Sequence, residues 1–218
     1  MTDDVEILGS DVTLRFWDDR HQANDDMRSG GNIAFDYEKN ELLYAVRLVR
    51  LIDILGLGSE PLPVRRLLDA GCGKGYYSRA MGRLGHTVDG IDGSPRAVSE
   101  CQSLAGPHES YAVSTLAEWA PPHQYDAVYC VDVAFHIMVD DDWAASMRNL
   151  ACLVRLGGLL VVADHAANAD RVWQQYQKTR AFSSYDSIFE AEGMSRVGFV
   201  PYGVFDSPVG FHVFTRDA

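Results

Sequence analysis

A chain of 218 residues with 47% hydrophobic and 23% charged side chains has the size and composition of one globular domain. Its 31 acidic and 19 basic side chains give a net charge of −12. This charge argues against nucleic acid, whose binding depends on Lys and Arg, and against anionic membrane surfaces, so we expect a small-molecule or protein partner.

The N-terminal sequence and the cysteines indicate a cytoplasmic protein. The first residues, MTDDVEILGSD, lack the basic and apolar regions of a signal peptide. No apolar run approaches the roughly 18 residues of a membrane span. The cysteines form no CxxC pair, and we interpret most of them as buried thiols of a reducing compartment. They are Cys72, Cys101, Cys130 and Cys152.

Residues 1–36 form a polar segment that we expect to act as a lid or cap over the site. Residues 1–35 have no clear periodicity, and they contain the break Ser29-Gly30-Gly31-Asn32. The first predicted helix runs from Tyr37 to Leu55, with apolar side chains on one face and a glycine directly after it. We therefore place the main domain at residues 37–218.

The next part of the chain alternates between short β-rich runs and helical patterns. The predicted strands are Arg66–Ala70, His86–Ile91, Tyr111–Val113, Tyr125–Val131 and Leu159–Ala163. The predicted helices are Tyr76–Leu84, Pro95–Ser103, Asp141–Val154 and Asp170–Lys178. This alternation is typical of a parallel sheet with right-handed helical crossovers.

After residue 180 the pattern changes. A helix near Tyr185–Glu192 precedes two β-rich runs, Val197–Val204 and Phe211–Thr215, with a short turn between them. These runs predict an antiparallel hairpin at the end of the sheet. The expected fold is therefore α/β: a doubly wound, Rossmann-like, seven-stranded sheet with a terminal antiparallel hairpin.

The sequence LLDAGCGKGYY, residues 67–77, carries the strongest chemical signal. An apolar strand leads into Asp69 and then into Gly71, Gly73 and Gly75 before a helix. Glycines at a strand-to-helix turn let the backbone approach a ligand, and the free N–H groups with the helix N-terminus favour a carboxylate or phosphate. A dinucleotide fingerprint requires glycine where Tyr76 stands, which argues against a nicotinamide cofactor.

A second signal ends the next predicted strand. The sequence HTVDGIDGSP places Asp92 about 20 residues after the glycines, where a carboxylate accepts hydrogen bonds from both ribose hydroxyls of a nucleoside. Ser94 and Pro95 then begin a helix as its N-cap and its first residue.

Four segments together resemble the motifs of class I S-adenosylmethionine-dependent methyltransferases, in particular their small-molecule group. They are DAGCGKG, GIDGSP, YDAVYCVDVAFHI and LVRLGGLLVVADH, within a resemblance over roughly residues 40–216. The resemblance implies the seven-stranded family fold and S-adenosylmethionine as cofactor, with S-adenosylhomocysteine as product. It also implies methyl transfer to an oxygen or nitrogen nucleophile of a small metabolite.

The resemblance further implies which residues contact the cofactor. These are Asp69, Gly71, Cys72, Gly73 and Gly75 at the methionine portion, Asp92, Gly93 and Ser94 at the ribose, Ser114, Thr115 and Leu116 at the adenine, and Val131 and Asp132 at the sulfonium. Many relatives have an acid in place of Ser114, which leaves the adenine contact open. The Asn/Asp-Pro-Pro-aromatic motif of base-modifying relatives is absent after the fourth strand, which again argues against a nucleic-acid substrate.

The ends of the fourth and fifth strands hold the candidates for removing a proton from the acceptor, because open α/β sheets bind ligands at this edge. We predict His165, at the tip of the fifth strand, as the general base, and His136 as the alternative. Asp132 is interpreted as a cofactor or positioning residue. A magnesium site on Asp132 and Asp164 is a further alternative, but His165 replaces the Asn of the metal-dependent subgroup, so we expect no metal.

Trp17, Arg20 and His21 are predicted to contact the substrate as part of the lid. The alternative is an N-terminal tail that Phe16 and Trp17 fix to the sheet. Two other functions stay open at this point. One is a non-catalytic S-adenosylmethionine-binding module, and the other is a nicotinamide-dependent oxidoreductase, which Tyr76 and the terminal hairpin disfavour.

Overall fold

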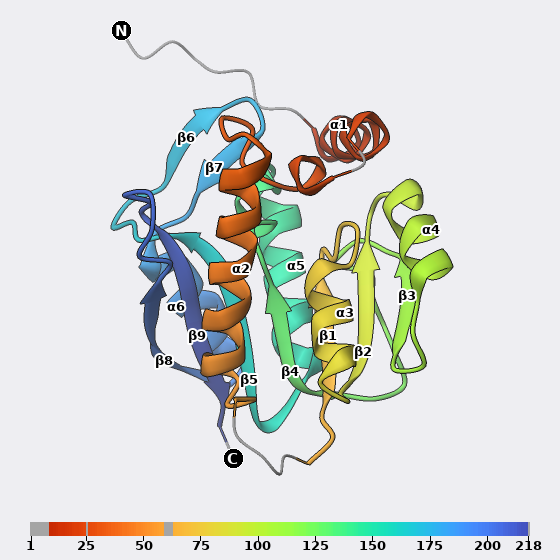
Figure 1. Cartoon of the computed structure of the whole chain (residues 1–218). Coiled ribbons are helices and arrows are strands. Elements are labelled where there is room, and N and C mark those ends of the chain that lie inside the picture. Colours follow the sequence, from red (N-terminus) through yellow and green to blue (C-terminus); the bar gives the residue numbers. More distant parts are fainter. Residues whose placement is uncertain (1–8, 25, 59–62, 218) are drawn as a thin grey trace, which may run out of the picture.

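The computed structural model describes residues 9–24, 26–58 and 63–217, in which helices flank a central sheet (Figure 1). Seven strands form this sheet in the order β3-β2-β1-β4-β5-β9-β8. They are β1 Arg66–Ala70, β2 Thr87–Asp92, β3 Glu109–Val113, β4 Tyr125–Cys130, β5 Val154–His165, β8 Met194–Pro201 and β9 Val209–Arg216. Strands β1 to β5 pair in parallel, whereas β9 runs antiparallel to β5 and β8. The predicted fold is confirmed.

Helices cover both faces of the sheet. Helices α2 Tyr37–Ile54, α3 Tyr76–Arg83 and α4 Pro95–Leu104 lie on one face, and α5 Asp140–Leu153 and α6 Phe182–Ala191 lie on the other (Figure 1). Neighbouring residues of a buried strand point to opposite faces. Leu67 therefore packs in the core beneath α2 and α3, whereas Leu68 packs in the core beneath α5 and α6.

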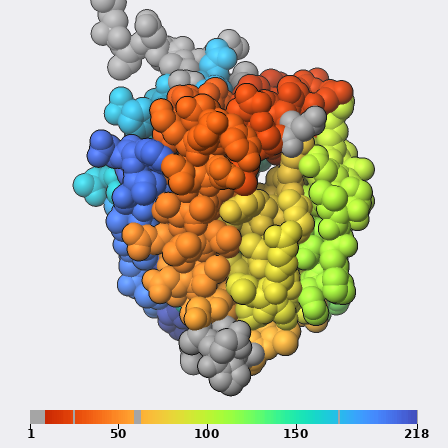
Figure 2. Space-filling model, viewed as in Figure 1, coloured from red at the N-terminus to blue at the C-terminus, as the bar shows by residue number. Residues whose placement is uncertain are grey.

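The N-terminal segment contains a helix that the sequence prediction missed. Helix α1, Ser10–Ala23, lies across the C-terminal end of the sheet, and the short 3-10 helix η1, Met27–Ser29, follows it (Figure 1). Figure 2 shows the red residues of α1 resting against the green residues of α4. The residues of α1 that are buried, Thr13 and His21, are polar, so the segment lacks the apolar periodicity that would have identified it. The predicted lid also includes residues 1–8 and 25, which lie outside the described residues.

A second correction concerns the helix predicted at Asp170–Lys178. The structure has a separate two-stranded hairpin there, with β6 Arg171–Gln174 and β7 Gln177–Thr179. The Trp173 indole Nε1 donates a hydrogen bond to Thr179 Oγ1 at 2.8 Å across the hairpin. The periodicity of a short run of mixed polar and apolar residues does not distinguish a helix from a strand, so tertiary contacts determine which structure forms here.

The cysteines are free thiols, with Cys72, Cys101 and Cys130 buried and Cys152 exposed. Within the described part of the chain, no helix has both the length and the apolar character needed to cross a membrane.

Candidate active site

A cavity of about 540 Å³ lies at the C-terminal ends of β1, β2 and β4, beneath α1. This volume falls in the range of small-molecule sites, roughly 300–1,000 Å³. Most of the predicted site residues line the cavity: Trp17, His21, Gly71, Cys72, Gly73, Asp92, Gly93, Ser94, Thr115, Leu116, Val131, Asp132 and His136. Five predicted residues do not line it: Arg20, Asp69, Gly75, Ser114 and His165.

The turn after β1 needs its glycines. Gly71, Gly73 and Gly75 have φ values of +83°, +51° and +73°, a region that other residues rarely adopt. A Cβ on Gly71 would clash with Val133 Cγ2, so the loop can pack against the exit of β4 only with glycine there. The Gly71 N–H group donates to the carbonyl oxygen of Ile91 at 2.8 Å, which ties the loop to β2.

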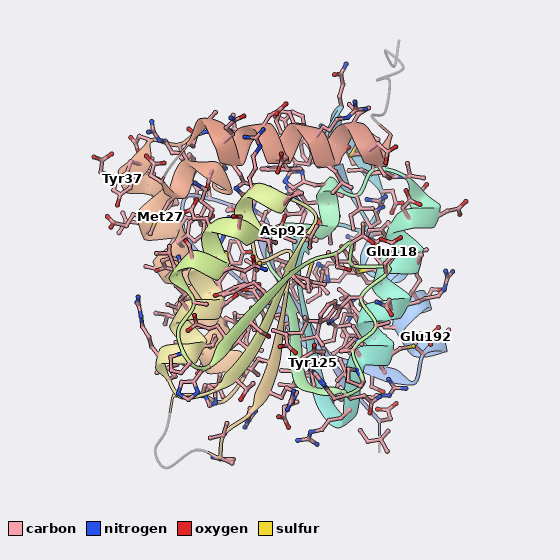
Figure 3. All side chains as sticks on the ribbon, turned by 90° about the vertical axis from the view of Figure 1, so that its right-hand side faces the viewer. Met27, Tyr37, Asp92, Glu118, Tyr125 and Glu192 are labelled. Carbon is pink, nitrogen blue, oxygen red and sulfur yellow. The ribbon has the colours of Figure 1, made fainter. Side chains whose placement is uncertain are left out.

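Asp92 occupies the middle of the site. Figure 3 shows it between Met27 and Glu118, two cavity-lining residues on opposite sides. Its carboxylate oxygens accept hydrogen bonds from the N–H groups of Gly73 and Ser94, each at 2.8 Å. These bonds orient the carboxylate and connect the glycine loop with the start of α4. Because a carboxylate has about four acceptor positions, Asp92 retains capacity for donors of a ligand.

Helix α1 forms the cover of the cavity. Ser10, Leu14, Trp17 and His21 follow one another at steps of three or four residues, with Thr13 beside Leu14, so one face of the helix lines the cavity. His21 also lies close to the glycine loop: its Cε1 atom is 3.5 Å from the position that a Cβ on Gly73 would occupy.

Asp18 connects this cover to the body of the domain. Its carboxylate accepts hydrogen bonds from Ser94 Oγ at 2.5 Å and from Arg96 Nε at 2.8 Å. At the end of α1, the Lys74 ammonium donates to the carbonyl oxygen of Asn24 at 2.9 Å. The cover is therefore joined to the segments that carry Asp92 and the glycine loop.

Arg20 supports the chain after α1 and does not line the cavity, contrary to the prediction. Its guanidinium donates to the carbonyl oxygens of Ser29, at 3.0 Å, and Gly31, at 3.3 Å. The same group lies 5.8 Å from the centre of the Trp17 ring. Arg20 thereby joins α1 to the segment around η1.

His136 lies in the short helix η2, Ala134–His136, directly after β4. Its Nδ1 atom is 2.7 Å from the carbonyl oxygen of Tyr176 in the β6–β7 turn, so Nδ1 carries the proton and donates it. The Trp17 ring packs on the imidazole, with centroids 4.5 Å apart. Burial lowers the pKa of His136 to about 4, which keeps the ring neutral at physiological pH. Its Nε2 atom therefore has a lone pair, and no donor among the described residues binds it.

His165 ends β5, as predicted, but its side chain does not reach the cavity. The ring stacks on Trp173 of β6, with centroids 5.6 Å apart, and contacts the edge of Phe135 at the same separation. Its Nδ1 atom is 3.1 Å from a carboxylate oxygen of Asp164, which is itself buried and accepts a hydrogen bond from Tyr185. The hairpin that sequence reasoning missed therefore covers one face of the His165 ring through Trp173.

Three predicted cofactor residues do not line the cavity. Asp69 is buried and accepts a hydrogen bond from Ser78 Oγ at 2.5 Å, and burial raises its pKa to about 7. Gly75 occupies the N-cap position of α3. The Ser114 hydroxyl donates to the carbonyl oxygen of Thr115 at 2.9 Å. These residues shape the loops.

Carboxylates outnumber cations around the cavity. Among the described lining residues, the carboxylates are Asp11, Asp26, Asp92, Glu100, Glu118, Asp132 and Asp142, and the cations are Lys74 and Arg79.

The sequence prediction missed two residues that line the cavity, Glu118 and Tyr44. The first had a local signal, because Thr115 precedes it by three residues and donates to its carboxylate at 2.8 Å. Tyr44 had none, because it lies on α2, before the motifs.

Among the residues that the structure describes, no group of three or more His, Cys, Asp or Glu side chains could hold a metal ion. The two carboxylates of the magnesium alternative have separate protein partners. Asp132 contacts Arg47 and Tyr202, whereas Asp164 contacts Tyr185 and His165.

Sequence comparison finds similarity to methyl-transferring proteins. Residues 67–158 match a family model described as a methyltransferase domain. The chain is 36% identical over 115 residues to the ubiquinone biosynthesis O-methyltransferase of Caulobacter sp. (strain K31), covering 50% of this chain and 44% of that protein. It is 38% identical over 126 residues to the protein of the same name from Aeromonas salmonicida (strain A449), covering 56% and 51%. The chain thus spans about half the length of the curated relatives it matches.

Structure comparison extends the fold similarity to nearly the whole chain. Magnesium protoporphyrin IX methyltransferase from Synechocystis PCC 6803 with bound SAM has a TM-score of 0.69 at 22% identity, covering 93% of this chain and 91% of that one. The 1,6-didemethyltoxoflavin-N1-methyltransferase of Burkholderia thailandensis has a TM-score of 0.68 at 15% identity, covering 95% and 88%. At these identities the comparison shows the fold.

Proposed function

Because residues 67–158 match the model of a methyltransferase domain, we propose that the chain binds S-adenosylmethionine in the cavity and transfers the methyl group to an oxygen or nitrogen nucleophile of a small metabolite. One observation carries this proposal. The glycine loop, Asp92 and the neutral His136 line one cavity beneath one cover, at the sheet edge where α/β folds bind ligands.

The shape and hydrogen-bonding capacity of the cavity suit this cofactor. The carboxylate of Asp92 would accept the ribose hydroxyls, and the glycine loop, which lines the cavity at Gly71 and Gly73, would contact the methionine portion. Thr115 and Leu116 would flank the adenine. The remaining wall consists of Cys72, Gly93, Ser94, Val131 and Asp132. Bound there, the cofactor supplies a methyl group on a positively charged sulfonium. Asp69, Gly75 and Ser114 would act by shaping the loops.

We assign proton removal to His136 rather than to His165. As a hydroxyl acceptor attacks, Nε2 of His136 would take its proton, while the bond from Nδ1 to the Tyr176 carbonyl oxygen holds the ring. Transfer also requires alignment of the reactants and exclusion of water. Helix α1 would exclude water as a lid, with Trp17 and His21 lining the cavity beneath it.

The nature of the acceptor follows from the walls and the charge. Trp17, Tyr44 and Tyr76 line the cavity with aromatic rings, which suits a small organic acceptor. The names of the relatives at 36% and 38% identity favour oxygen as the methylated atom. The net charge of −12 argues against nucleic acid, and the free cysteines support a cytoplasmic location.

Calorimetry tests the cofactor. The wild-type protein, Asp92→Ala and a control, Asp53→Ala on the exposed side of α2, are titrated with S-adenosylmethionine, S-adenosylhomocysteine and NADH. We expect micromolar binding of both sulfur nucleosides, abolished in Asp92→Ala and retained in the control. Binding of NADH alone would overturn the proposal in favour of a dehydrogenase.

A methyl-transfer screen tests catalysis. Phenols, alcohols and amines are incubated with a labelled methyl donor and the wild-type protein, His136→Gln, or the exposed control His108→Gln. We expect His136→Gln to lower the rate about 10²–10⁴-fold, the usual contribution of a general base. Full activity in His136→Gln would refute the base assignment. Cofactor binding without transfer to any acceptor would favour the non-catalytic module instead.

A further inference from the structure

The turn that leaves β4 has an unusual backbone conformation. Asp132 follows the strand directly and has a φ of +56°, in the left-handed region that costs free energy for residues other than glycine. From this residue the chain turns off the sheet into η2, which carries His136. On its other side the turn meets the glycine loop, since Val133 fills the space where Gly71 lacks a Cβ. The conformation of Asp132 therefore sets the position of His136 relative to the glycine loop.

Two side chains from distant parts of the sequence hold the Asp132 carboxylate. Arg47 of α2 forms an ion pair with Oδ2, and the hydroxyl of Tyr202, directly after β8, donates to Oδ1 at 2.6 Å. The Arg47 guanidinium is 5.6 Å from the ring centre of Tyr44 and 5.1 Å from that of Tyr202, and the residue is only 4% exposed. The carboxylate is thus fixed from the α2 side of the cavity wall.

We propose that Arg47 is a positioning residue for methyl transfer: through Asp132 it holds the left-handed turn that places His136 beside the glycine loop. The catalytic meaning of this inference rests on the proposed function. A buried charge pair is weak evidence for added stability, but it can specify one arrangement of the chain. Precise placement matters at this point, because a displacement of about 1 Å in an active site can cost about 100-fold in rate.

Histidine NMR provides a test that needs no acceptor. The protein is labelled at histidine Cε1, and the His136 signal is titrated in the wild type, Arg47→Met, Asp132→Asn and the double variant, with and without S-adenosylhomocysteine. Release of the turn should expose His136 and relieve the burial that lowers its pKa most, so we expect this pKa to rise by about one unit or more in each single variant, although Asp132→Asn also removes a charge that raises it. The double variant should shift no further, because Arg47 acts only through Asp132. In Arg47→Met, the affinity for S-adenosylhomocysteine should change by less than about threefold, because Arg47 does not line the cavity and Asp92 and the glycines are intact.

Two further variants keep the test decisive. Arg50→Met is the matched control, because Arg50 is an exposed arginine on the same helix, and it should leave the His136 titration unchanged. Tyr202→Phe removes one hydroxyl and serves if Arg47→Met fails to fold; it should raise the His136 pKa in the same direction. A folded Arg47→Met with an unchanged His136 titration would overturn the inference, as would additive shifts in the double variant. Failure of the wild type to bind S-adenosylhomocysteine would refute the proposed function, whereas the titrations of the free protein would still test the turn.

Discussion

His136 should stay a neutral base at pH values where an exposed histidine is protonated. The ordinary pKa of histidine is about 6.5, and burial lowers that of His136 to about 4. At pH 5, a pKa of 6.5 leaves about 3% of the ring neutral, whereas a pKa of about 4 leaves about 90% neutral. Protonation removes the lone pair of Nε2. Activity should therefore fall only as the pH drops through the lowered pKa. At pH 5 the neutral, active fraction of His136 is about 30-fold larger with a pKa of about 4 than it would be with the ordinary pKa of 6.5.

The assay combines rates with a direct titration. Initial rates of methyl transfer are measured with saturating donor and acceptor from roughly pH 4.5 to pH 8. This interval includes the pH values at which a His136 pKa of about 4 and one of 6.5 predict different rates. The His136 ring signal is followed by NMR over the same interval, and His136→Gln identifies that signal. His165→Gln is the matched control, because His165 is a second histidine at a strand end but lies beneath Trp173. Its pH profile should coincide with that of the wild type.

Two results would refute this reasoning. A His136 titration near its ordinary pKa, with rates that follow it, would mean that the ring is not buried as described. An acid limb that moves in His165→Gln would make His165 the titrating base. Circular dichroism at each pH separates both results from unfolding.

Two further predictions concern stability and the cover. Burial lowers the pKa of His212 to about 4. Below about pH 6.5 this histidine is therefore protonated in the unfolded chain but stays neutral in the folded protein. Proton binding by the unfolded chain then lowers the free energy of unfolding as the pH falls. In urea titrations between pH 7 and pH 5, the wild type should lose about 2 kcal/mol more than His212→Gln, and equal losses would contradict the burial argument. Asp18→Asn should weaken the link from α1 to Arg96 by up to about 1 kcal/mol, which stopped-flow measurements would detect as release of S-adenosylhomocysteine up to about fivefold faster. An unchanged release rate would mean that the contact between Asp18 and Arg96 does not hold the cover in place.

The sequence predicted the part of the site that depends on local backbone geometry. The glycines after β1 stand where the chain needs positive φ, and Asp92 ends β2, so their spacing alone indicated a shared site. The alternation of strands and helices predicted the sheet for the same reason, since each element carries its own apolar periodicity.

Elements whose inner face is polar escaped prediction. Helix α1 directs Thr13 and His21 inwards, towards a cavity rather than a core, so its sequence has no apolar stripe. The β6–β7 hairpin is short and lies outside the main sheet, so no pattern in the sequence showed that its Trp173 stacks on His165 or that its turn binds His136. The pair of Arg47 and Asp132 joins positions 85 residues apart, which no local pattern can reveal.

The excess of carboxylates around the cavity has a consequence for turnover. The methyl donor carries a sulfonium charge, and methyl transfer removes that charge and leaves a neutral thioether. Walls in which carboxylates outnumber cations stabilise the charged donor more than the product. Methyl transfer would thus lower the affinity of the cavity for the product relative to the donor. Added salt would reduce this difference in affinity by screening the carboxylates. The acidity of the chain, which at first only argued against nucleic acid, would then help to clear the site after each reaction.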